Sequence, residues 1–287
     1  MPPLPKISVV TPCFNSTATI RDTIESVLRQ GYPNFEHIVM DGASTDGTIE
    51  LLKEYPHLIW VSERDDGHYQ AMNKGIERAT GEIVAVLNAD DCYRPGALQA
   101  VGEAFAAHPD WDGLFGDVIF VDGHGREIYR REEAVFDYDV LRYSGVCYVI
   151  HPTLFVKKTV YEKLGAFRYK ELKNSADYDF ILRLGRAGCR IGHVPALLVD
   201  YRWHALGQSA DLRIQQNMQR EQALIRREHG APDGLRGRLT SVLAKGKRQL
   251  QKLRHRGKCD LVSGKWLLRK HMHEKTNFSS NIGLDKL

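Results

Sequence analysis

Cysteine is scarce in this sequence, and the spacing of the few cysteines argues against two common stabilising devices. The 287 residues contain five cysteines, an odd number, and no two of them form a Cys-x-x-Cys pair. A disulfide framework needs paired cysteines, and a structural zinc site needs closely spaced ligands. The pattern therefore favours a reducing compartment.

Long apolar runs are also missing. No apolar stretch approaches the length of a membrane span, and the segment Met1–Lys6 is too short and too rich in proline for a signal peptide. We therefore expect a cytoplasmic protein, with peripheral binding at the inner face of the cytoplasmic membrane left open.

The usual glycine-rich phosphate loops are absent as well. Gly-x-Gly-x-x-Gly does not follow the first apolar run, which argues against a dinucleotide fold, and no Gly-x-x-x-x-Gly-Lys-Ser/Thr loop occurs. A nucleotide that binds to this chain must therefore be held by carboxylates and a metal ion instead.

The composition is that of a globular protein with a basic tail. Hydrophobic residues make up 43% and charged residues 26%, which suits one large domain with an appendage, or two domains. Between Arg236 and Lys275 there are thirteen Lys or Arg against two acids. An apolar stripe recurs at helical spacing in this segment, at Leu239, Val242, Leu243, Leu250 and Leu253.

A basic amphipathic helix of this kind has three possible roles. It can lie on an anionic membrane surface, pack on the core of the protein, or serve as an arm that binds a partner. Trp266–Leu268, between two basic residues, would suit an interfacial anchor. The sequence leaves these alternatives open, and it makes nucleic acid an unlikely partner.

Strands alternate with helices in the first third of the chain. Apolar runs rich in β-branched residues predict strands over residues 6–13, 35–40, 58–62 and 84–87, and apolar residues at helical spacing predict helices over residues 20–28, 48–55 and 69–79. Such βαβ units form a parallel sheet covered on both faces. Because proline cannot continue a central ladder, we expect the first strand to stop at Pro12.

Polar clusters follow each of these four strands, at Thr11–Pro12, Asp41–Gly42, Glu63–Gly67 and Asp90–Asp91. Open α/β sheets bind ligands outside the carboxyl ends of their strands. Two adjacent carboxylates repel each other, and a hard divalent ion that carries a phosphate would offset their charge. Asp90–Asp91 alone would suit a turn, but four clusters at one edge favour a binding site.

Segments in a characteristic order and spacing run from about residue 6 to residue 210: Ile7–Ser16, Val39–Thr48, Ala71–Ile76, Thr80–Asp91, His151–Phe155, Tyr161–Phe167 and Ala176–Arg183. Through these segments the chain resembles the family 2 glycosyltransferases, inverting enzymes with the GT-A fold, of the bacterial polysaccharide-biosynthesis type. The resemblance implies an α/β GT-A domain over residues 1–210, with a mostly parallel sheet flanked by helices. The nucleotide-binding half would be about residues 1–125 and the acceptor and catalytic half about 126–210, followed by a basic helical extension over 211–287.

The same resemblance implies a donor site at the strand ends. Asp41 would accept a hydrogen bond from the imide N–H of uracil or thymine, which favours a UDP or dTDP sugar. Gln70 stands where relatives carry Asp, so its neighbours are weakly assigned. The implied donor-binding residues are Thr11, Pro12, Asn15, Asp41, Asp65, Tyr69, Asn73, Lys74 and Asp90.

The metal and the chemistry are implied in the same way. Asp91 would be the stronger ligand of a Mn²⁺ or Mg²⁺ ion, with Asp90 and His204 as further ligands. A hydroxyl that attacks an anomeric carbon needs a base, and Asp177 fits that role. Capping of the helix that follows is the alternative reading of Asp177, and His151 would border the acceptor site.

These inferences predict an inverting, metal-dependent glycosyltransferase. It would move a sugar from a nucleotide diphosphate donor to a hydroxyl of a saccharide or lipid-linked saccharide. Two alternatives remain: a nucleotidyltransferase that forms nucleotide sugars, for which the triphosphate loop after the first strand is missing, and a non-catalytic protein that binds nucleotide sugars or nucleic acid.

Overall fold

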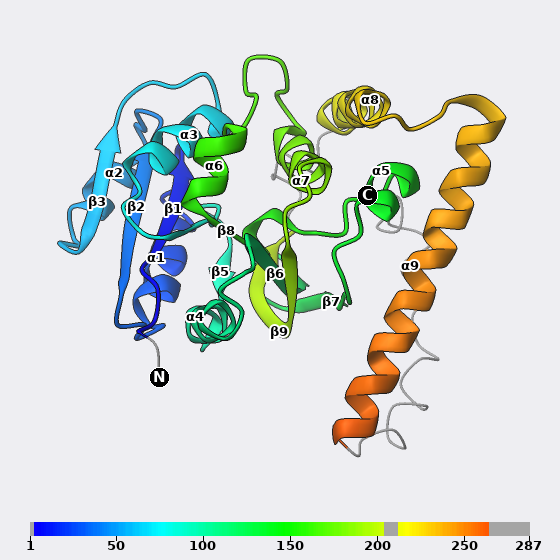
Figure 1. Cartoon of the computed structure of the whole chain (residues 1–287). Helices are drawn as coiled ribbons and strands as arrows, with labels where there is room; N and C mark the ends of the chain where they lie inside the picture. Colours follow the sequence, from blue (N-terminus) through cyan, green and yellow to red (C-terminus); the bar gives the residue numbers. More distant parts are fainter. Residues whose placement is uncertain (1–2, 204–211, 264–287) are drawn as a thin grey trace.

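Nine strands form one sheet in the part of the chain that the computed structural model describes, residues 3–203 and 212–263. The strand order is β3-β2-β1-β4-β8-β6-β9-β5, and β7 pairs with β6 (Figure 1). The strands are β1 (Ile7–Cys13), β2 (Phe35–Asp41), β3 (Leu58–Ser62), β4 (Ile83–Val86), β5 (Cys92–Tyr93), β6 (Gly113–Val121), β7 (Glu127–Arg131), β8 (Leu154–Lys157) and β9 (Ile191–Arg202).

Helices cover both faces of this sheet. They are α1 (Ile20–Leu28), α2 (Thr48–Leu52), α3 (His68–Arg78), α4 (Ala97–Ala107), α5 (Tyr138–Ser144), the short 3₁₀ helix η1 (His151–Thr153), α6 (Lys158–Leu164), α7 (Ala176–Arg186), α8 (Leu212–Glu228) and α9 (Gly234–Ser263). The predicted α/β class is confirmed, and so is the helical C-terminal region.

The side chains of the central strands point alternately to the two faces of the sheet, and a separate hydrophobic core lies on each face. Val10 and Val84 pack with α3, α6 and α7 on one face, whereas Val9 and Ala85 pack with α1 and α4 on the other. Successive side chains of a strand point to opposite faces, so strands that are apolar throughout must be covered twice. The absence of a side chain at Gly75 lets α3 lie close on β1, since a Cβ there would come within 2.3 Å of Val10 Cγ1.

The first strand does not stop at Pro12 as predicted. It continues to Cys13 and pairs with β2 over its whole length. Its pairing with β4 ends at Val10, whose carbonyl accepts the N–H of Leu87. The backbone N–H and C=O groups of successive residues in a strand point alternately to its two neighbouring strands. The backbone of Pro12 therefore points toward β4, where pairing has already ended, so its missing N–H removes no hydrogen bond.

The sheet is mixed: the strands β3, β2, β1 and β4 have the expected parallel order, and the rest of the sheet combines both directions. Strand β8 lies between β4 and β6 and is antiparallel to both. Strand β6 then pairs in parallel with β9, and β9 holds β5 antiparallel. The sheet therefore runs without a break through both halves of the expected GT-A domain.

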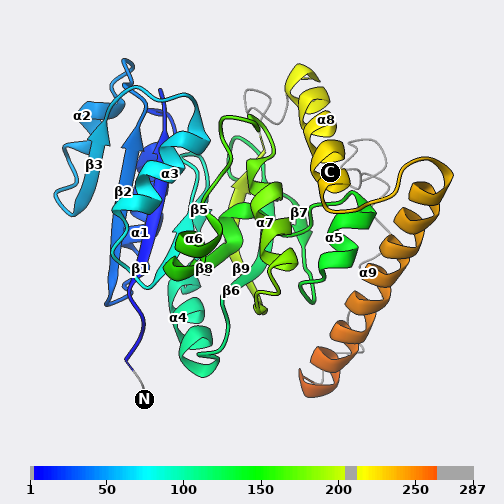
Figure 2. The same cartoon turned by 45° about the horizontal axis from the view of Figure 1, so that its top comes forward.

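The two C-terminal helices pack against the core at the side of the molecule away from β3 (Figures 1 and 2). On α8, Ile225 is fully buried, and the Arg226 guanidinium donates to the carbonyl oxygens of Arg142 and Tyr143. Helix α9 lies along α5, and its residue Arg248 forms an ion pair with Glu133. His204 and Trp266–Leu268 lie outside the described residues. Within those residues, no helix combines the length and the apolar character that crossing a bilayer requires.

Candidate active site

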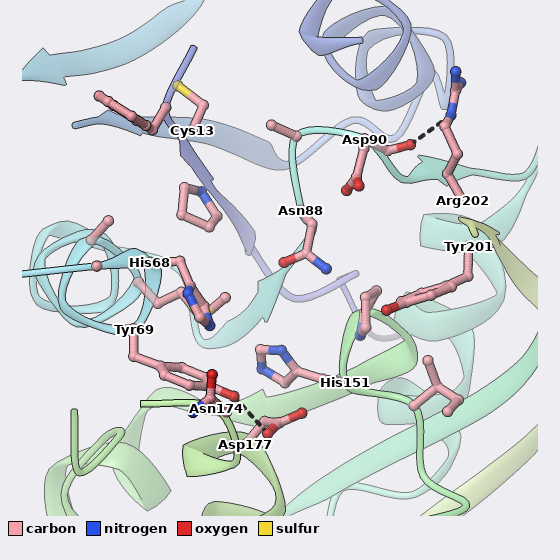
Figure 3. A pocket seen from close by; sticks show the side chains of 18 of the residues that line it. Cys13, His68, Tyr69, Asn88, Asp90, His151, Asn174, Asp177, Tyr201 and Arg202 are labelled. Carbon is pink, nitrogen blue, oxygen red and sulfur yellow. Dashed lines mark hydrogen bonds between the residues drawn. The ribbon is translucent and has the colours of Figure 1, made fainter. Parts of the chain in front are cut away.

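A cleft of about 750 Å³ opens at the carboxyl ends of the central strands. Its walls come from the ends of β1, β4 and β9, the start of α3, η1, the start of α7 and the first half of α8. Figure 3 shows Asp90 beside Arg202 in one part of the cleft and Asp177 beside Tyr69 in another. The predicted site residues that line it are Pro12, Asn15, Asp65, Tyr69, Asp90, His151 and Asp177.

The two adjacent carboxylates after β4 have different surroundings. Asp90 lines the cleft, and its backbone carbonyl accepts a hydrogen bond from Arg202 Nε at 3.1 Å. Asp91 is 1% exposed and does not line the cleft, because one carboxylate oxygen accepts the Arg202 N–H and the other accepts Asn88 Nδ2, both at 2.9 Å. Burial and the neighbouring Asp90 raise the pKa of Asp91 well above its usual range.

Asp91, predicted as the stronger metal ligand, is therefore turned away from the cleft. The carboxylate that faces the cleft belongs to Asp90, whereas Asp91 serves the turn that presents it. The amide of Asn88 also lines the cleft. In the described part of the chain, no group of three or more His, Cys, Asp and Glu side chains is placed to hold a metal ion. A site with one carboxylate still fits Mg²⁺ or Mn²⁺, because such ions keep several waters and bind substrate phosphates together with one or two carboxylates.

Asp177 lies in the second position of α7 and faces the cleft. One of its carboxylate oxygens accepts the Tyr69 hydroxyl at 2.7 Å. Burial and the proximity of Asp177 raise the pKa of Tyr69 well above its usual value, so this phenol remains a hydrogen-bond donor. The helix begins after Ser175, and no side chain caps it, so the alternative reading of Asp177 as the cap is wrong.

Asp179, two residues further on, points away from the cleft. It is 1% exposed and forms ion pairs with Arg168 at 2.6 Å and with Arg183 at 2.8 Å. Arg183 also donates to the carbonyl oxygens of residues 164–166. This buried cluster fixes α7 and with it the position of Asp177.

Two of the residues predicted to hold the nucleobase lie behind the cleft. Thr11 is fully buried and shares a hydrogen bond of 2.9 Å with His37 Nε2. Asp41 is 1% exposed, and its carboxylate accepts the N–H and hydroxyl of Ser44 and the hydroxyl of Ser62 at 2.6 Å. Neither lines the cleft, because Thr11 bonds β1 to β2, and Asp41 bonds the end of β2 to the loop that follows it and to β3.

Asn15 and Asp65 line this part of the cleft instead. Asn15 has a φ of 48°, donates its N–H to Ser44 Oγ and accepts the Thr45 N–H, which ties the two strand-end loops together. Asp65 lies against Gly42, where a Cβ would approach Asp65 Oδ2 to 2.9 Å. A residue larger than glycine there would displace the carboxylate.

Asn73 and Lys74 do not line the cleft. The Asn73 amide pairs with the backbone N–H and C=O of Phe167, at 2.9 and 2.8 Å, and Lys74 forms an ion pair of 2.8 Å with Glu63. Gln70, which departs from the family pattern, accepts the Asp66 N–H at 2.6 Å. The predicted donor contacts of Asn73 and Lys74 are therefore not supported by the geometry.

His151 lies in the cleft near Asp177 and is 7% exposed (Figure 3). Burial, together with the nearby His68, lowers its pKa to about 4, although Asp177 acts in the opposite direction. His151 is therefore neutral at physiological pH, and its ring stands edge-on to Phe167 with centroids 5.1 Å apart.

Several cleft residues were not predicted from the sequence. Arg202 contacts Asp91 through its backbone N–H and Asp22 through its guanidinium, at 3.2 Å. Its position at the end of an apolar strand is the signal that could have indicated it. Ile214, Met218 and Gln222 enter the cleft from α8, which no motif marked. The remaining unpredicted polar or aromatic lining residues include His68, Asn88, Arg131, Asn174, Tyr201 and Trp203.

A sheet with a carboxylate-lined cleft at its strand ends is what the resemblance to the family 2 glycosyltransferases implied, and the comparisons with known proteins give the family. The model of the family described as "Glycosyl transferase family 2" matches residues 8–165. The chain belongs to this family and is a glycosyltransferase. A "PGL/p-HBAD biosynthesis glycosyltransferase" from Mycobacterium bovis is 31% identical over 188 residues, which cover 62% of this chain and 69% of that protein.

Solved structures share the fold at low identity. TarS 1-349 of S. aureus in complex with UDP-GlcNAc matches with a TM-score of 0.60 and 18% identity, covering 86% of this chain and 81% of that chain. The mannosyltransferase PcManGT from Pyrobaculum calidifontis in complex with GDP-Man and Mn²⁺ matches with a TM-score of 0.57 and 19% identity, covering 85% and 74%. The chain spans 60% of another TarS 1-349 structure and 42% of the longer TarS structure.

Proposed function

We propose that this glycosyltransferase is inverting and metal-dependent, and that it transfers a sugar from a nucleotide diphosphate donor to a hydroxyl of a saccharide or lipid-linked saccharide. The acceptor oxygen attacks the anomeric carbon while its proton passes to Asp177. The bond between that carbon and the diphosphate breaks, and its electron pair leaves with the nucleoside diphosphate. A single displacement of this kind inverts the anomeric configuration.

The observation that carries this proposal is the position of Asp177. Its carboxylate faces the cleft, is held by the Tyr69 hydroxyl at 2.7 Å, and sits on a helix anchored by the buried Asp179. A general base must lie within hydrogen-bond reach of the proton it takes and must hold its geometry. Asp177 belongs to the wall from α7, and Figure 3 shows it in a different part of the cleft from Asp90.

Asp90 and Asn88 would hold the divalent ion. When bound, the ion neutralises the charge that develops on the leaving diphosphate. Asp90 presents its carboxylate to the cleft, and Arg202 fixes the backbone of Asp90. Arg202 itself lines the cleft and brings a permanent positive charge to the same wall.

UDP or dTDP is the proposed nucleotide, and two structural neighbours bind nucleotide sugars with different bases. TarS was solved with UDP-GlcNAc and PcManGT with GDP-Man. In this chain, Pro12, Phe14, Asn15 and Asp65 line the wall nearest the ends of β1 and β2. Asp65 replaces Asp41 as the carboxylate within reach of an imide N–H, because Asp41 lies behind the wall.

Replacement of Asp177 by Asn tests the assignment of the base. We expect turnover to fall by about a hundred- to ten-thousandfold, since a positioned base contributes roughly 10²–10⁴-fold, whereas nucleotide-sugar binding measured by thermal shift with Mn²⁺ stays unchanged. A panel of UDP, dTDP and GDP sugars identifies the donor first. Normal turnover in the Asn variant would refute the role of Asp177.

Two further experiments test the metal assignment. EDTA should stop turnover, and Asp90→Asn should weaken Mn²⁺-dependent nucleotide binding more than Asp91→Asn does in protein that is still folded. Full activity in EDTA would remove the metal from the mechanism without affecting the assignment of Asp177.

A further inference from the structure

Helix α9 presents its apolar residues to solvent rather than to the core. Of the twelve large apolar side chains that are exposed in the described part of the chain, six lie on α9. Their exposed fractions range from 57% for Leu250 to 74% for Leu235. The six are Leu235, Leu239, Val242, Leu243, Leu250 and Leu253.

These six residues lie on one face of the helix, in two groups, Leu235–Leu243 and Leu250–Leu253, with Gly246 between them. At 3.6 residues per turn, they fall within about 100° of the helix circumference, and at 1.5 Å per residue they extend over roughly 27 Å of its length. Single exposed apolar residues are common on protein surfaces, but an apolar stripe of this size marks an interaction site.

The opposite side of α9 is already occupied by the protein. Ser241 donates its hydroxyl to the carbonyl of Ser144 at 3.0 Å, Ala244 is buried, and Gln251 donates to Asp137 at 2.7 Å. Arg248 pairs with the buried Glu133. The helix is thus fixed on the core by one face, so the apolar stripe on the other face is held outward and cannot turn in.

Basic residues border the stripe along both of its edges. Arg236 and Arg254 follow one edge, and Arg238 and Lys245 follow the other; all four are exposed. No acidic residue occurs between Gly234 and Cys259. The face therefore combines an apolar centre with positive margins.

We propose that this face of α9 docks on the surface of an anionic lipid bilayer, with the helix parallel to the membrane plane. The apolar stripe enters the boundary between head groups and acyl chains, and the bordering cations meet the phosphates, which is the pattern of interfacial helices. A second copy of the chain is a poor occupant, because helices paired through this stripe would set like charges against each other along both edges. Nucleic acid would satisfy the cations but leave six apolar side chains in water.

Sedimentation of the full chain with vesicles tests this inference. Phosphatidylcholine vesicles that contain phosphatidylglycerol should pull down the protein at low salt, and vesicles of phosphatidylcholine alone should do so far less. Leu239→Ser with Leu243→Ser should weaken this binding by about tenfold or more. Arg238→Gln with Lys245→Gln should weaken it by about fivefold for each charge removed.

A matched control uses two exposed apolar residues outside α9. Leu28→Ser with Ile59→Ser removes side chains that are 44% and 47% exposed in α1 and β3, and this variant should sediment with the vesicles like the unmodified protein. All the replaced residues are exposed, so the variants should keep the thermal stability of the unmodified chain.

Three results would overturn the proposal. The unmodified protein remains in the supernatant with anionic vesicles at low salt, or the leucine variant binds vesicles as well as the control does, or sedimentation equilibrium shows a dimer that the leucine changes dissociate. The last result would make the face an interface between copies. Because the readout is binding, failure here would leave the proposed transfer reaction untouched.

Discussion

Replacement of Tyr69 by Phe should lower turnover while leaving the donor site intact. The Tyr69 hydroxyl donates to Asp177 at 2.7 Å, and its ring packs against Phe167 with centroids 5.5 Å apart. The change removes one oxygen and keeps the ring, so it tests the hydrogen bond rather than the packing. A hydrogen bond to a charged group is worth about 1.5–3 kcal/mol. Since about 1.4 kcal/mol corresponds to a tenfold change in rate, we expect kcat to fall by about ten- to a hundredfold.

The assay follows release of the nucleoside diphosphate from the nucleotide sugar that gives the largest thermal shift. Loss of a positioning contact should reduce kcat with little change in the KM for the donor, whereas general damage to the fold would change both. Tyr32→Phe is the matched control, because Tyr32 is also buried and donates its hydroxyl to Pro5 O at 2.7 Å, outside the cleft. Unchanged kcat in Tyr69→Phe, or an equal loss in both variants, would refute the view that Tyr69 positions the base.

Two further predictions concern stability and protonation. Asp179→Ala should lower the free energy of unfolding by about 3 kcal/mol, because it breaks a buried ion pair. The control Asp233→Ala breaks an exposed ion pair with Arg227 and should change the free energy of unfolding by less than about 0.5 kcal/mol. Urea unfolding measures both changes. His151, whose pKa burial lowers to about 4, should show no titration between pH 6 and 8 in NMR spectra of its ring. In the unfolded chain, the pKa of His151 is near the ordinary 6.5, so below pH 6.5 unfolding is accompanied by uptake of a proton at this residue. His151 should therefore reduce the stability of the fold as the pH falls from about 6.5 to 4. His151→Gln should make stability depend less on pH in this range.

The sequence pattern predicted the first half of the fold well because its apolar residues repeat with clear periods. Short apolar runs that alternate with segments of helical periodicity indicate strands that are buried on both faces of a parallel sheet. The prediction that β1 ends at Pro12 is wrong, because the missing N–H of a proline breaks a sheet only where a neighbouring strand would accept it. The sequence of β1 does not show where its pairing with β4 ends. The antiparallel strand β8, with four residues, carries too little periodicity to reveal its direction.

The location of the cleft at the strand ends could be predicted from the sequence, but several of the residues that line it could not. Strand ends marked Pro12, Asp65 and Asp90 correctly as cleft residues, because the carboxyl ends of parallel strands meet at one edge. Which of two adjacent carboxylates faces inward depends on the turn, and the Arg202 N–H that turns Asp91 away comes from a residue 111 positions later. The Asp41 carboxylate accepts hydrogen bonds from Ser44 in the following loop and from Ser62 in β3, and these contacts cannot be predicted from spacing.

The attachment of α8 has a consequence for how this enzyme can diversify. Glu221 accepts the backbone N–H groups of Lys173 and Asn174, at 3.0 and 2.9 Å, just before the helix that carries Asp177. The same helix places Ile214 and Met218 in the cleft, although it lies beyond residue 165, where the family match ends. One wall of the cleft beside Asp177 is therefore a separate segment. If Asp177 is the base as proposed, changes in α8 alter which acceptors fit while the walls from β1 and β4 stay the same.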